Sequence, residues 1–163
     1  MVGDSVTWRG GDELARLAPD LAVDGEPARR PTELPARLAA YRDRNGQPTG
    51  LIVELGTNPA QGYDRRDLAA AIRVLPERTP VLLVAPYVET STEPVVLSAW
   101  SQRFGGWMRS IAAGRPHTCV ADWPAYARSH EGLLQDGIHP RNATEGQWAA
   151  WVVQQWSDCL RAD

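Results

Sequence analysis

The chain contains no lysine, because all 17 of its basic residues are arginine. This absence excludes Schiff-base catalysis on a lysine, a lysine general base and a phosphate-binding loop that ends in lysine. Genome base composition also shifts the balance between lysine and arginine, so the number of arginines is not evidence of a function.

Long hydrophobic runs are also absent. No segment approaches the ~20 apolar residues that span a membrane, and we expect no signal peptide, since the chain opens directly on a candidate active-site motif. The net charge of −3 gives no reason to expect nucleic acid or an anionic membrane surface as a partner. The only cysteines, Cys119 and Cys159, are compatible with one disulfide or with two buried thiols, and their spacing indicates no metal site.

The residues that are present are those of an ordinary globular domain. The chain has 163 residues, of which 43% are hydrophobic and 23% charged, so it is long enough to bury one core. Strands are predicted at 21–23, 51–55, 80–86 and 118–122, besides the N-terminal segment. Helices are predicted at 12–17, 32–44, 64–75, 94–113 and 142–160, with a loop at 87–93 and an irregular or weakly helical segment at 123–135. This alternation predicts one α/β domain over 1–163, a three-layer α/β/α sandwich around a parallel sheet of about five strands.

A short motif at the N-terminus organises the rest of the chain. Gly3-Asp4-Ser5 follows an apolar entry of two residues and precedes a polar segment. A serine on such a strand-to-helix turn lies near a helix N-terminus, where free N–H groups and the helix dipole favour negative charge. A strand before a buried turn usually has about five residues, so the short entry favours a domain that is a fragment of a longer chain.

A nucleophilic serine needs a base and a group that orients the base. His139 is a candidate base because Asp136 precedes it by three residues, a spacing that lets a turn direct both side chains the same way. Asn58 follows the buried strand 51–55 and offers an N–H donor to an oxyanion. Each residue also has a structural interpretation: Ser5 as a helix N-cap, Asn58 as a turn residue, and a backbone carbonyl in place of Asp136 as the partner of His139.

Together these motifs resemble the SGNH (GDSL-like) hydrolase superfamily, whose four blocks centre on Ser, Gly, Asn and His. Gly3-Asp4-Ser5 is similar to the first block, Gly56-Thr57-Asn58 to the third and Asp136-Gly137-Ile138-His139 to the fourth. The chain is most similar to the SGNH domains fused to membrane acyltransferase-3 domains in bacterial cell-wall O-acetyltransferases. Further support comes from the segments 23–25, 84–88 and 120–123. The resemblance implies a flavodoxin-like SGNH fold.

The resemblance also implies an oxyanion hole made of the Ser5 N–H, a backbone N–H of the second block and the side chain of Asn58. Ala28 is the expected second-block donor, with Gly25 as the other candidate. Ala28 stands where the acetyltransferase subgroup has glycine, and Pro59 also replaces a usual glycine. Both departures bear on substrate shape more than on reaction type.

Three further residues are expected to bind substrate. Tyr87 and Trp123 follow predicted strand ends, where ligands bind in open α/β sheets. Arg29 stands in the second block beside Arg30, although two such arginines are equally typical of a solvated loop.

The predicted function is a serine esterase that cleaves a small acyl ester, expected to be acetyl, through an acyl-enzyme on Ser5. One alternative is an O-acetyltransferase domain that passes acetyl to a cell-wall glycan hydroxyl and acts with a membrane acyltransferase domain of the parent chain. Another is a carbohydrate-binding module without turnover. None of these needs a metal or a cofactor. A cell-wall acetyltransferase domain would lie outside the cytoplasm, and an esterase of another kind would be cytoplasmic.

Overall fold

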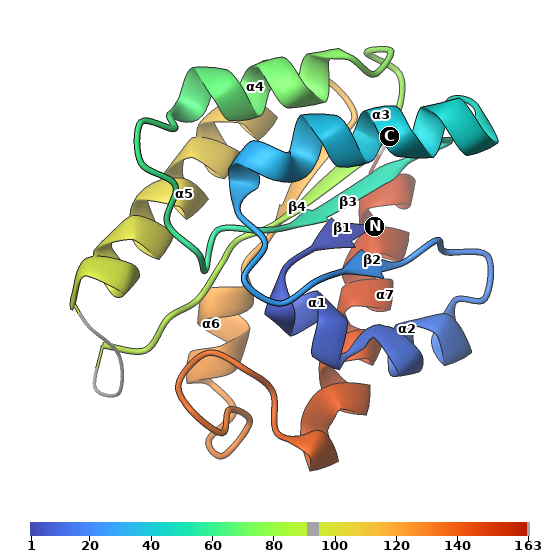
Figure 1. Cartoon of the computed structure of the whole chain (residues 1–163). Coiled ribbons are helices and arrows are strands. Elements are labelled where there is room, and N and C mark those ends of the chain that lie inside the picture. Colours follow the sequence, from blue (N-terminus) through green and yellow to red (C-terminus); the bar gives the residue numbers. More distant parts are fainter. Residues whose placement is uncertain (91–94, 163) are drawn as a thin grey trace.

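The computed structural model describes residues 1–90 and 95–162 of the chain. Five parallel strands form one sheet in the order β2-β1-β3-β4-β5, which confirms the predicted α/β sandwich (Figure 1). The strands are β1 (Val2–Gly3), β2 (Asp24–Gly25), β3 (Leu51–Glu54), β4 (Val81–Val84) and β5 (Thr118–Ala121). Each strand runs in the same direction, so all carboxyl ends lie at one edge of the sheet.

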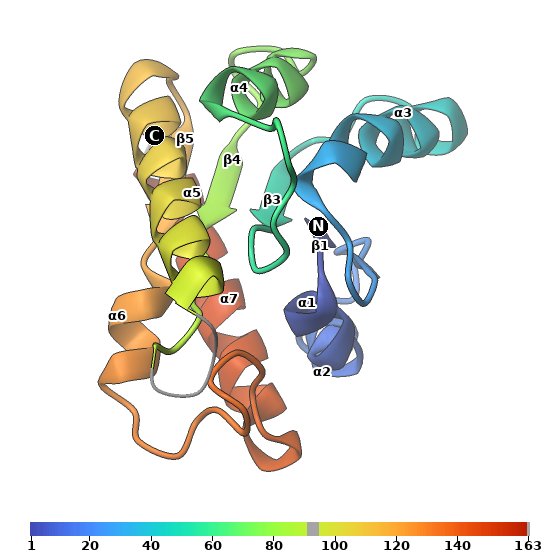
Figure 2. The same ribbon diagram turned by 60° about the vertical axis from the view of Figure 1, so that its left-hand side comes forward.

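Helices cover both faces of the sheet (Figures 1 and 2). They are α1 (Ser5–Arg9), α2 (Gly11–Leu17), α3 (Leu34–Asn45), α4 (Arg65–Arg73), α5 (Val95–Gly114), α6 (Trp123–Arg128) and α7 (Glu145–Arg161), with 3₁₀ turns η1 (Pro31–Glu33) and η2 (Asn142–Thr144). Successive strand residues point to opposite faces. Leu51 and Val53 therefore pack with α3, α4 and α5, while Ile52 packs with α1, α2, α6 and α7. Burial on both faces explains why these strands are unbroken apolar runs.

Two predicted elements differ from the structure. The strand predicted at 21–23 was wrong, because β2 lies at Asp24–Gly25, where Val2 pairs with Asp24 and Gly3 with Gly25. Since β1 itself has two residues, it can pair with only two on β2. The segment 123–135 begins with a definite helix, α6, whose N-cap Asp122 accepts a hydrogen bond from the Ala125 N–H.

The connection before α5 is described only in part. The predicted loop 87–93 and the predicted helix start at residue 94 overlap residues 91–94, which lie outside the described residues. The helix is described from Val95 onward, close to its predicted start.

A disulfide joins Cys119 on β5 to Cys159 on α7, with their Cα atoms 5.8 Å apart. Of the two alternatives for the cysteines, the structure therefore has the disulfide. It ties the edge strand of the sheet to the helix that covers it.

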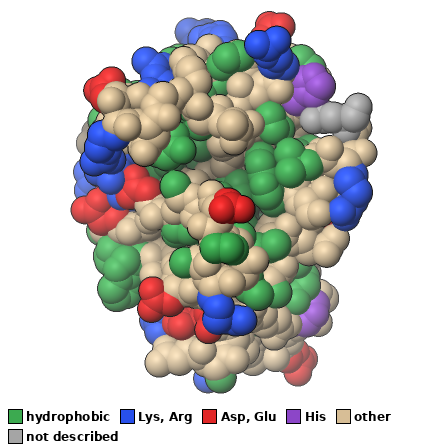
Figure 3. All heavy atoms as spheres, turned by 90° about the vertical axis from the view of Figure 1, so that its right-hand side faces the viewer, with side chains coloured by type: hydrophobic (Ala, Val, Ile, Leu, Met, Phe, Trp, Pro, Cys, Tyr) green, Lys and Arg blue, Asp and Glu red, His purple; other side chains and the backbone are tan. Residues whose placement is uncertain are grey.

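A cavity of about 890 Å³ lies at the amino ends of the strands. Its lining includes Met1, Leu51 and Trp156, and Figure 3 looks onto this side of the molecule, where hydrophobic side chains gather. Because Ser5 follows the carboxyl end of β1, this cavity is at the opposite end of the sheet from the motif residues. Within 1–90 and 95–162, no helix is long and apolar enough to cross a membrane.

Candidate active site

The turn between β1 and α1 presents Ser5 at the first position of a helix. Asp4 caps this helix, and its side chain accepts a hydrogen bond from the Val6 N–H at 3.1 Å. A Cβ atom at residue 3 would lie 1.9 Å from Thr7 Oγ1, so only glycine fits there. The Ser5 N–H belongs to the first helical turn, where amide groups have no acceptor within the helix.

The structure brings Ser5, His139 and Asp136 into one hydrogen-bonded row. His139 Nε2 lies 2.8 Å from Ser5 Oγ, and His139 Nδ1 lies 2.7 Å from Asp136 Oδ2. The other Asp136 oxygen accepts hydrogen bonds from the N–H groups of Ile138 and His139, at 3.0 and 2.8 Å. Partial burial opposes ionisation of Asp136, but the hydrogen bonds outweigh it and lower the pKa of this carboxyl to about 2. Asp136 is therefore a carboxylate that holds the His139 ring toward Ser5.

The loop that carries His139 connects α6 to α7 and reaches the carboxyl edge of the sheet (Figure 1). Within the loop, the Gln135 N–H donates to the His139 carbonyl at 3.0 Å. On its other side, the Glu89 N–H donates to the Gly137 carbonyl at 2.8 Å, which attaches the loop to the segment after β4.

Arg9 attaches the same loop to α1. Its Nη2 donates to Asn142 Oδ1 at 2.6 Å and to Gln135 Oε1 at 3.2 Å, and its Nε lies 3.4 Å from Glu145 Oε1. The helix that starts with Ser5 is thus connected to both flanks of the loop that supplies His139. No local sequence signal marks Arg9, since its partners are more than 100 residues away.

Two buried carboxyl groups lie behind the nucleophile. Asp4 accepts hydrogen bonds from the Thr57 hydroxyl at 2.6 Å and from the Thr57 N–H at 3.3 Å. Glu54 accepts from the Thr7 hydroxyl at 2.8 Å and from the Thr7 N–H at 3.2 Å. Asp4 thus braces the turn by hydrogen bonding. Glu54 was overlooked, although a charged residue inside the apolar run 51–55 was a usable signal.

Burial raises the pKa of both carboxyl groups. For Asp4, hydrogen bonds from Thr57 and Val6 and the nearby His139 counteract part of that rise. For Glu54, the charge of Asp4 adds to the effect of burial, and its pKa lies well above the usual range. The two groups cannot both ionise at low cost, so we conclude that Glu54 carries the proton.

The residues predicted to form an oxyanion hole, Ser5, Ala28 and Asn58, follow the carboxyl ends of the adjacent strands β1, β2 and β3. Asn58 Nδ2 lies 3.3 Å from the Arg29 carbonyl and 3.2 Å from Thr57 Oγ1, so its donors reach the loop that contains Ala28. Both contacts are long for hydrogen bonds. Ala28 has a φ of 61°, in the left-handed region that favours glycine. This backbone angle explains why a glycine is expected at that position.

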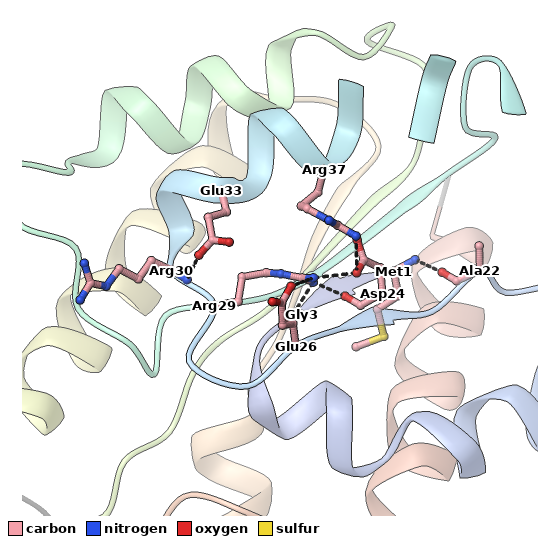
Figure 4. Close-up of polar contacts among 9 residues, drawn as sticks. All are labelled: Met1, Gly3, Ala22, Asp24, Glu26, Arg29, Arg30, Glu33 and Arg37. Atoms are coloured by element: carbon pink, nitrogen blue, oxygen red, sulfur yellow. Dashed lines mark hydrogen bonds and ion pairs between the residues drawn. The ribbon is translucent and has the colours of Figure 1, made fainter. Parts of the chain in front are cut away.

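Arg29 does not bind substrate, and that prediction was wrong. Its side chain is only 2% exposed and extends from its loop toward Gly3, Asp24 and Glu26 (Figure 4). It donates to the Gly3 carbonyl at 2.9 Å, to Asp24 Oδ1 at 2.7 Å and to Glu26 Oε2 at 2.9 Å. The guanidinium is therefore a brace between β1 and the loop after β2. The Arg30 side chain points away from this network.

Trp123 was also predicted wrongly as a substrate-binding residue. Its side chain is 1% exposed and packs against the rings of Tyr126 and Trp151, with centroids 5.8 and 5.2 Å away. The first residue of α6 points inward because the helix begins directly at the strand end. Tyr87 is half-buried, has the Arg128 guanidinium 5.7 Å from its ring centre and lines a cavity of about 360 Å³.

In the described part of the chain, no group of three or more His, Cys, Asp or Glu side chains is arranged to hold a metal ion. What the arrangement offers chemically is a hydroxyl, an imidazole within hydrogen-bond distance of it, a carboxylate on the other ring nitrogen, and N–H donors beside the hydroxyl.

No protein-family model matches the sequence, and neither does any curated protein. Solved structures do match. The C-terminal catalytic domain of peptidoglycan O-acetyltransferase A from Streptococcus pneumoniae superposes with a TM-score of 0.84 at 20% identity, over 98% of this chain and 92% of that chain. A lipolytic protein of the G-D-S-L family from Veillonella parvula gives 0.74 at 16% identity, over 96% of both chains. The psychrotrophic esterase EstA from Pseudoalteromonas gives 0.69 at 16% identity, over 98% of this chain and 96% of that chain. The predicted SGNH fold, and the predicted similarity to an O-acetyltransferase domain, are confirmed as structural similarities.

Proposed function

We propose that this protein is a serine esterase that cleaves a small acyl ester through an acyl-enzyme. The observation that carries the proposal is the row Ser5 Oγ, His139 and Asp136, with contacts of 2.8 and 2.7 Å at the N-terminus of a helix. The fold shared with esterases and with an O-acetyltransferase catalytic domain supports it. Acyl transfer needs a nucleophile, a base and oxyanion donors, and residues of each kind meet at this edge of the sheet.

In the first half of the proposed reaction, Ser5 Oγ bonds to the carbonyl carbon of the ester while its proton passes to His139 Nε2. The carbonyl oxygen becomes an oxyanion that accepts hydrogen bonds from the N–H groups of Ser5 and Ala28 and from Asn58 Nδ2. Asp136 stabilises the imidazolium formed on His139. The bond to the leaving alcohol then breaks, and His139 returns the proton to the alcohol oxygen, which leaves an acyl-serine.

In the second half, a hydroxyl group attacks the acyl carbon and gives its proton to His139. The bond between the acyl carbon and Ser5 Oγ breaks, and Ser5 recovers a proton from His139. With water as the attacking group the product is a free acid. With a sugar hydroxyl it is a new ester, and the same residues serve both outcomes.

Transfer to a glycan is the second candidate function. The observation that favours it is the superposition on the catalytic domain of a peptidoglycan O-acetyltransferase, at a TM-score of 0.84. On this proposal the donor acyl group is acetyl, the acceptor is a cell-wall glycan, and the domain works outside the cytoplasm beside a membrane acyltransferase domain. A carbohydrate-binding module has less support, because its function would not need the hydrogen-bonded row.

The direct test is release of p-nitrophenol from p-nitrophenyl acetate. We expect Ser5→Ala to lower kcat/KM by about 10³-fold or more, since the nucleophile is lost. Ser110→Ala, which changes an exposed serine on α5, is the matched control and should behave like the unaltered protein. Mass spectrometry after treatment with a fluorophosphonate should place the label on Ser5. A folded protein that neither turns over the ester nor takes the label would contradict the proposal and favour the binding module.

A further inference from the structure

Trp8 differs from the other tryptophans of the chain in its exposure. Its side chain is 59% exposed, whereas the other six are buried or half-buried. Tryptophan has the largest apolar surface to gain from burial. An indole left in solvent three residues after a candidate nucleophile therefore calls for a binding role.

Helical geometry places Trp8 on the outer side of α1 with Ser5. Residues three apart on a helix lie on the same side, about 60° from each other. Val6 and Thr7 are buried and take the inward directions. Arg9, four residues after Ser5, lies about 40° from Ser5 on the side opposite to Trp8. Its side chain reaches the loop of His139. Trp8 therefore stands on the flank of Ser5 that faces away from that loop.

The flank of α1 that carries Trp8 is bounded by β2 and the loop after it. A Cβ atom at residue 25 would lie 2.5 Å from Trp8 N and 2.7 Å from Trp8 Cα, so Gly25 lies directly against the backbone of α1. The Glu26 N–H donates to the Gly3 carbonyl at 3.3 Å, which keeps the following loop close to the same turn. The residue that bears the indole thus lies beside the strand that leads into the loop of Ala28.

From this placement we infer that Trp8 is the platform on which the acceptor sugar stacks during acyl transfer. The inference rests on the proposed acyl transfer and names a residue that would select a sugar over water. One face of a pyranose ring carries C–H groups and packs on the flat indole, while the ring hydroxyls at its edge remain free for hydrogen bonds. Such a rigid aromatic side chain provides contact area at little cost in conformational entropy.

The chemistry of the site favours a sugar over an acyl chain as occupant. A short acyl group bonded to Ser5 Oγ has little apolar surface beyond its carbonyl group, so it offers an indole little to pack against. A ring stacked on Trp8 brings a hydroxyl to the acyl carbon. The hydroxyl proton passes to His139 Nε2 as the sugar oxygen bonds to the acyl carbon. The bond from the acyl carbon to Ser5 Oγ then breaks, and Ser5 Oγ takes the proton from His139. The stacked ring also displaces water from the rim, which lowers competing hydrolysis.

Binding of chitotetraose to an inactive protein tests this role without turnover. Calorimetric titration of Ser5→Ala should show binding, and the double variant Ser5→Ala/Trp8→Ala should bind about tenfold more weakly or worse. Ser5→Ala/Trp8→Phe should keep most of the affinity, because it retains an aromatic face. The control Ser5→Ala/Leu160→Ala removes another large hydrophobic side chain, 47% exposed on α7, and should match Ser5→Ala. Equal affinity with and without the indole, or no binding by Ser5→Ala at millimolar sugar, would overturn the inference.

A second measurement follows products with p-nitrophenyl acetate as donor and chitotetraose as acceptor. We expect Trp8→Ala to lower the ratio of acetylated sugar to free acetate at least fivefold relative to the unaltered protein. An unchanged ratio would overturn the inference. If the unaltered protein releases no p-nitrophenol, the proposed function fails, and the titrations of the Ser5→Ala series alone decide whether Trp8 binds the sugar.

Discussion

At the scale of single residues, Glu54 is the least expected feature of the site. Its carboxyl group is buried, accepts two hydrogen bonds from Thr7 and lies close enough to Asp4 for the two charges to repel each other. Its pKa is raised in the folded state, so the native protein keeps a proton that the unfolded chain releases above about pH 4.5. The free energy of unfolding contributed by this group therefore falls as the pH rises from that value toward the raised pKa of the folded state.

We expect Glu54→Gln to flatten this pH dependence. Glutamine keeps an oxygen for Thr7 and cannot ionise, so the loss of stability with rising pH should shrink by up to about 1.4 kcal/mol per pH unit over the range where Glu54 titrates. Urea unfolding between pH 5 and pH 9 measures how the free energy of unfolding depends on pH. Glu131→Gln, at an exposed glutamate, is the control. A variant whose stability falls with pH as steeply as that of the unaltered protein would show that Glu54 is ionised in the folded state.

Residue identity could be predicted well where a motif is local. Ser5 follows Gly3-Asp4, and Asp136 precedes His139 by three residues, so these groups can be recognised from short stretches of sequence. Arg29 and Trp123 were misjudged because their positions in the sequence say nothing about their direction. An arginine on a loop can face solvent or turn inward to meet Asp24, and only packing decides between the two.

At the scale of elements, α1 depends on its neighbours. It has five residues, too few for a helix to persist alone in water. Asp4 and the Thr7–Glu54 contacts hold its inner side, and Arg9 holds its outer side to the His139 loop. The separation between Ser5 and His139 therefore depends on a side chain that touches neither.

We expect Arg9→Ala to lower kcat for p-nitrophenyl acetate about tenfold while KM changes less than twofold. Releasing the loop displaces the His139 ring, and small misplacements of reacting groups are costly in rate. Arg16→Ala, which removes an exposed arginine paired with Glu13 on α2, is the matched control and should leave kcat unchanged. If Arg9→Ala raised KM with kcat intact, Arg9 would be a substrate-binding residue and not a positioning one.

At the scale of the whole molecule, the disulfide connects β5, the edge strand of the sheet, to the last helix, α7. It closes a loop of 40 residues between Cys119 and Cys159. Restricting an unfolded chain by a loop of this length is worth about 4 kcal/mol in the chain-entropy model. The bridge joins β5 to α7, whereas Ser5 and His139 lie beyond the carboxyl ends of the strands.

We therefore expect the double variant Cys119→Ala/Cys159→Ala to lose about 2–4 kcal/mol of unfolding free energy. The kcat/KM of the folded variant should stay within twofold of the unaltered protein. Urea unfolding with and without reductant measures the free energy of unfolding. Reductant should lower this free energy only for the protein that has the cysteines. A loss below about 0.5 kcal/mol would mean that the bridge adds nothing to the stability of the fold.

The sequence by itself determined the order of strands and helices and the residues of the nucleophile and histidine motifs. Both are local properties: unbroken apolar runs are needed for strands buried on two faces, and a turn needs Gly3 and Asp4 close to Ser5. Only the tertiary structure decided that Arg29 and Trp123 point inward, that Arg9 reaches partners 126 to 136 residues away, and that Trp8 stands in solvent beside Ser5. Those outcomes depend on which side chains the packed layers bring together, and no segment of the chain contains that information alone.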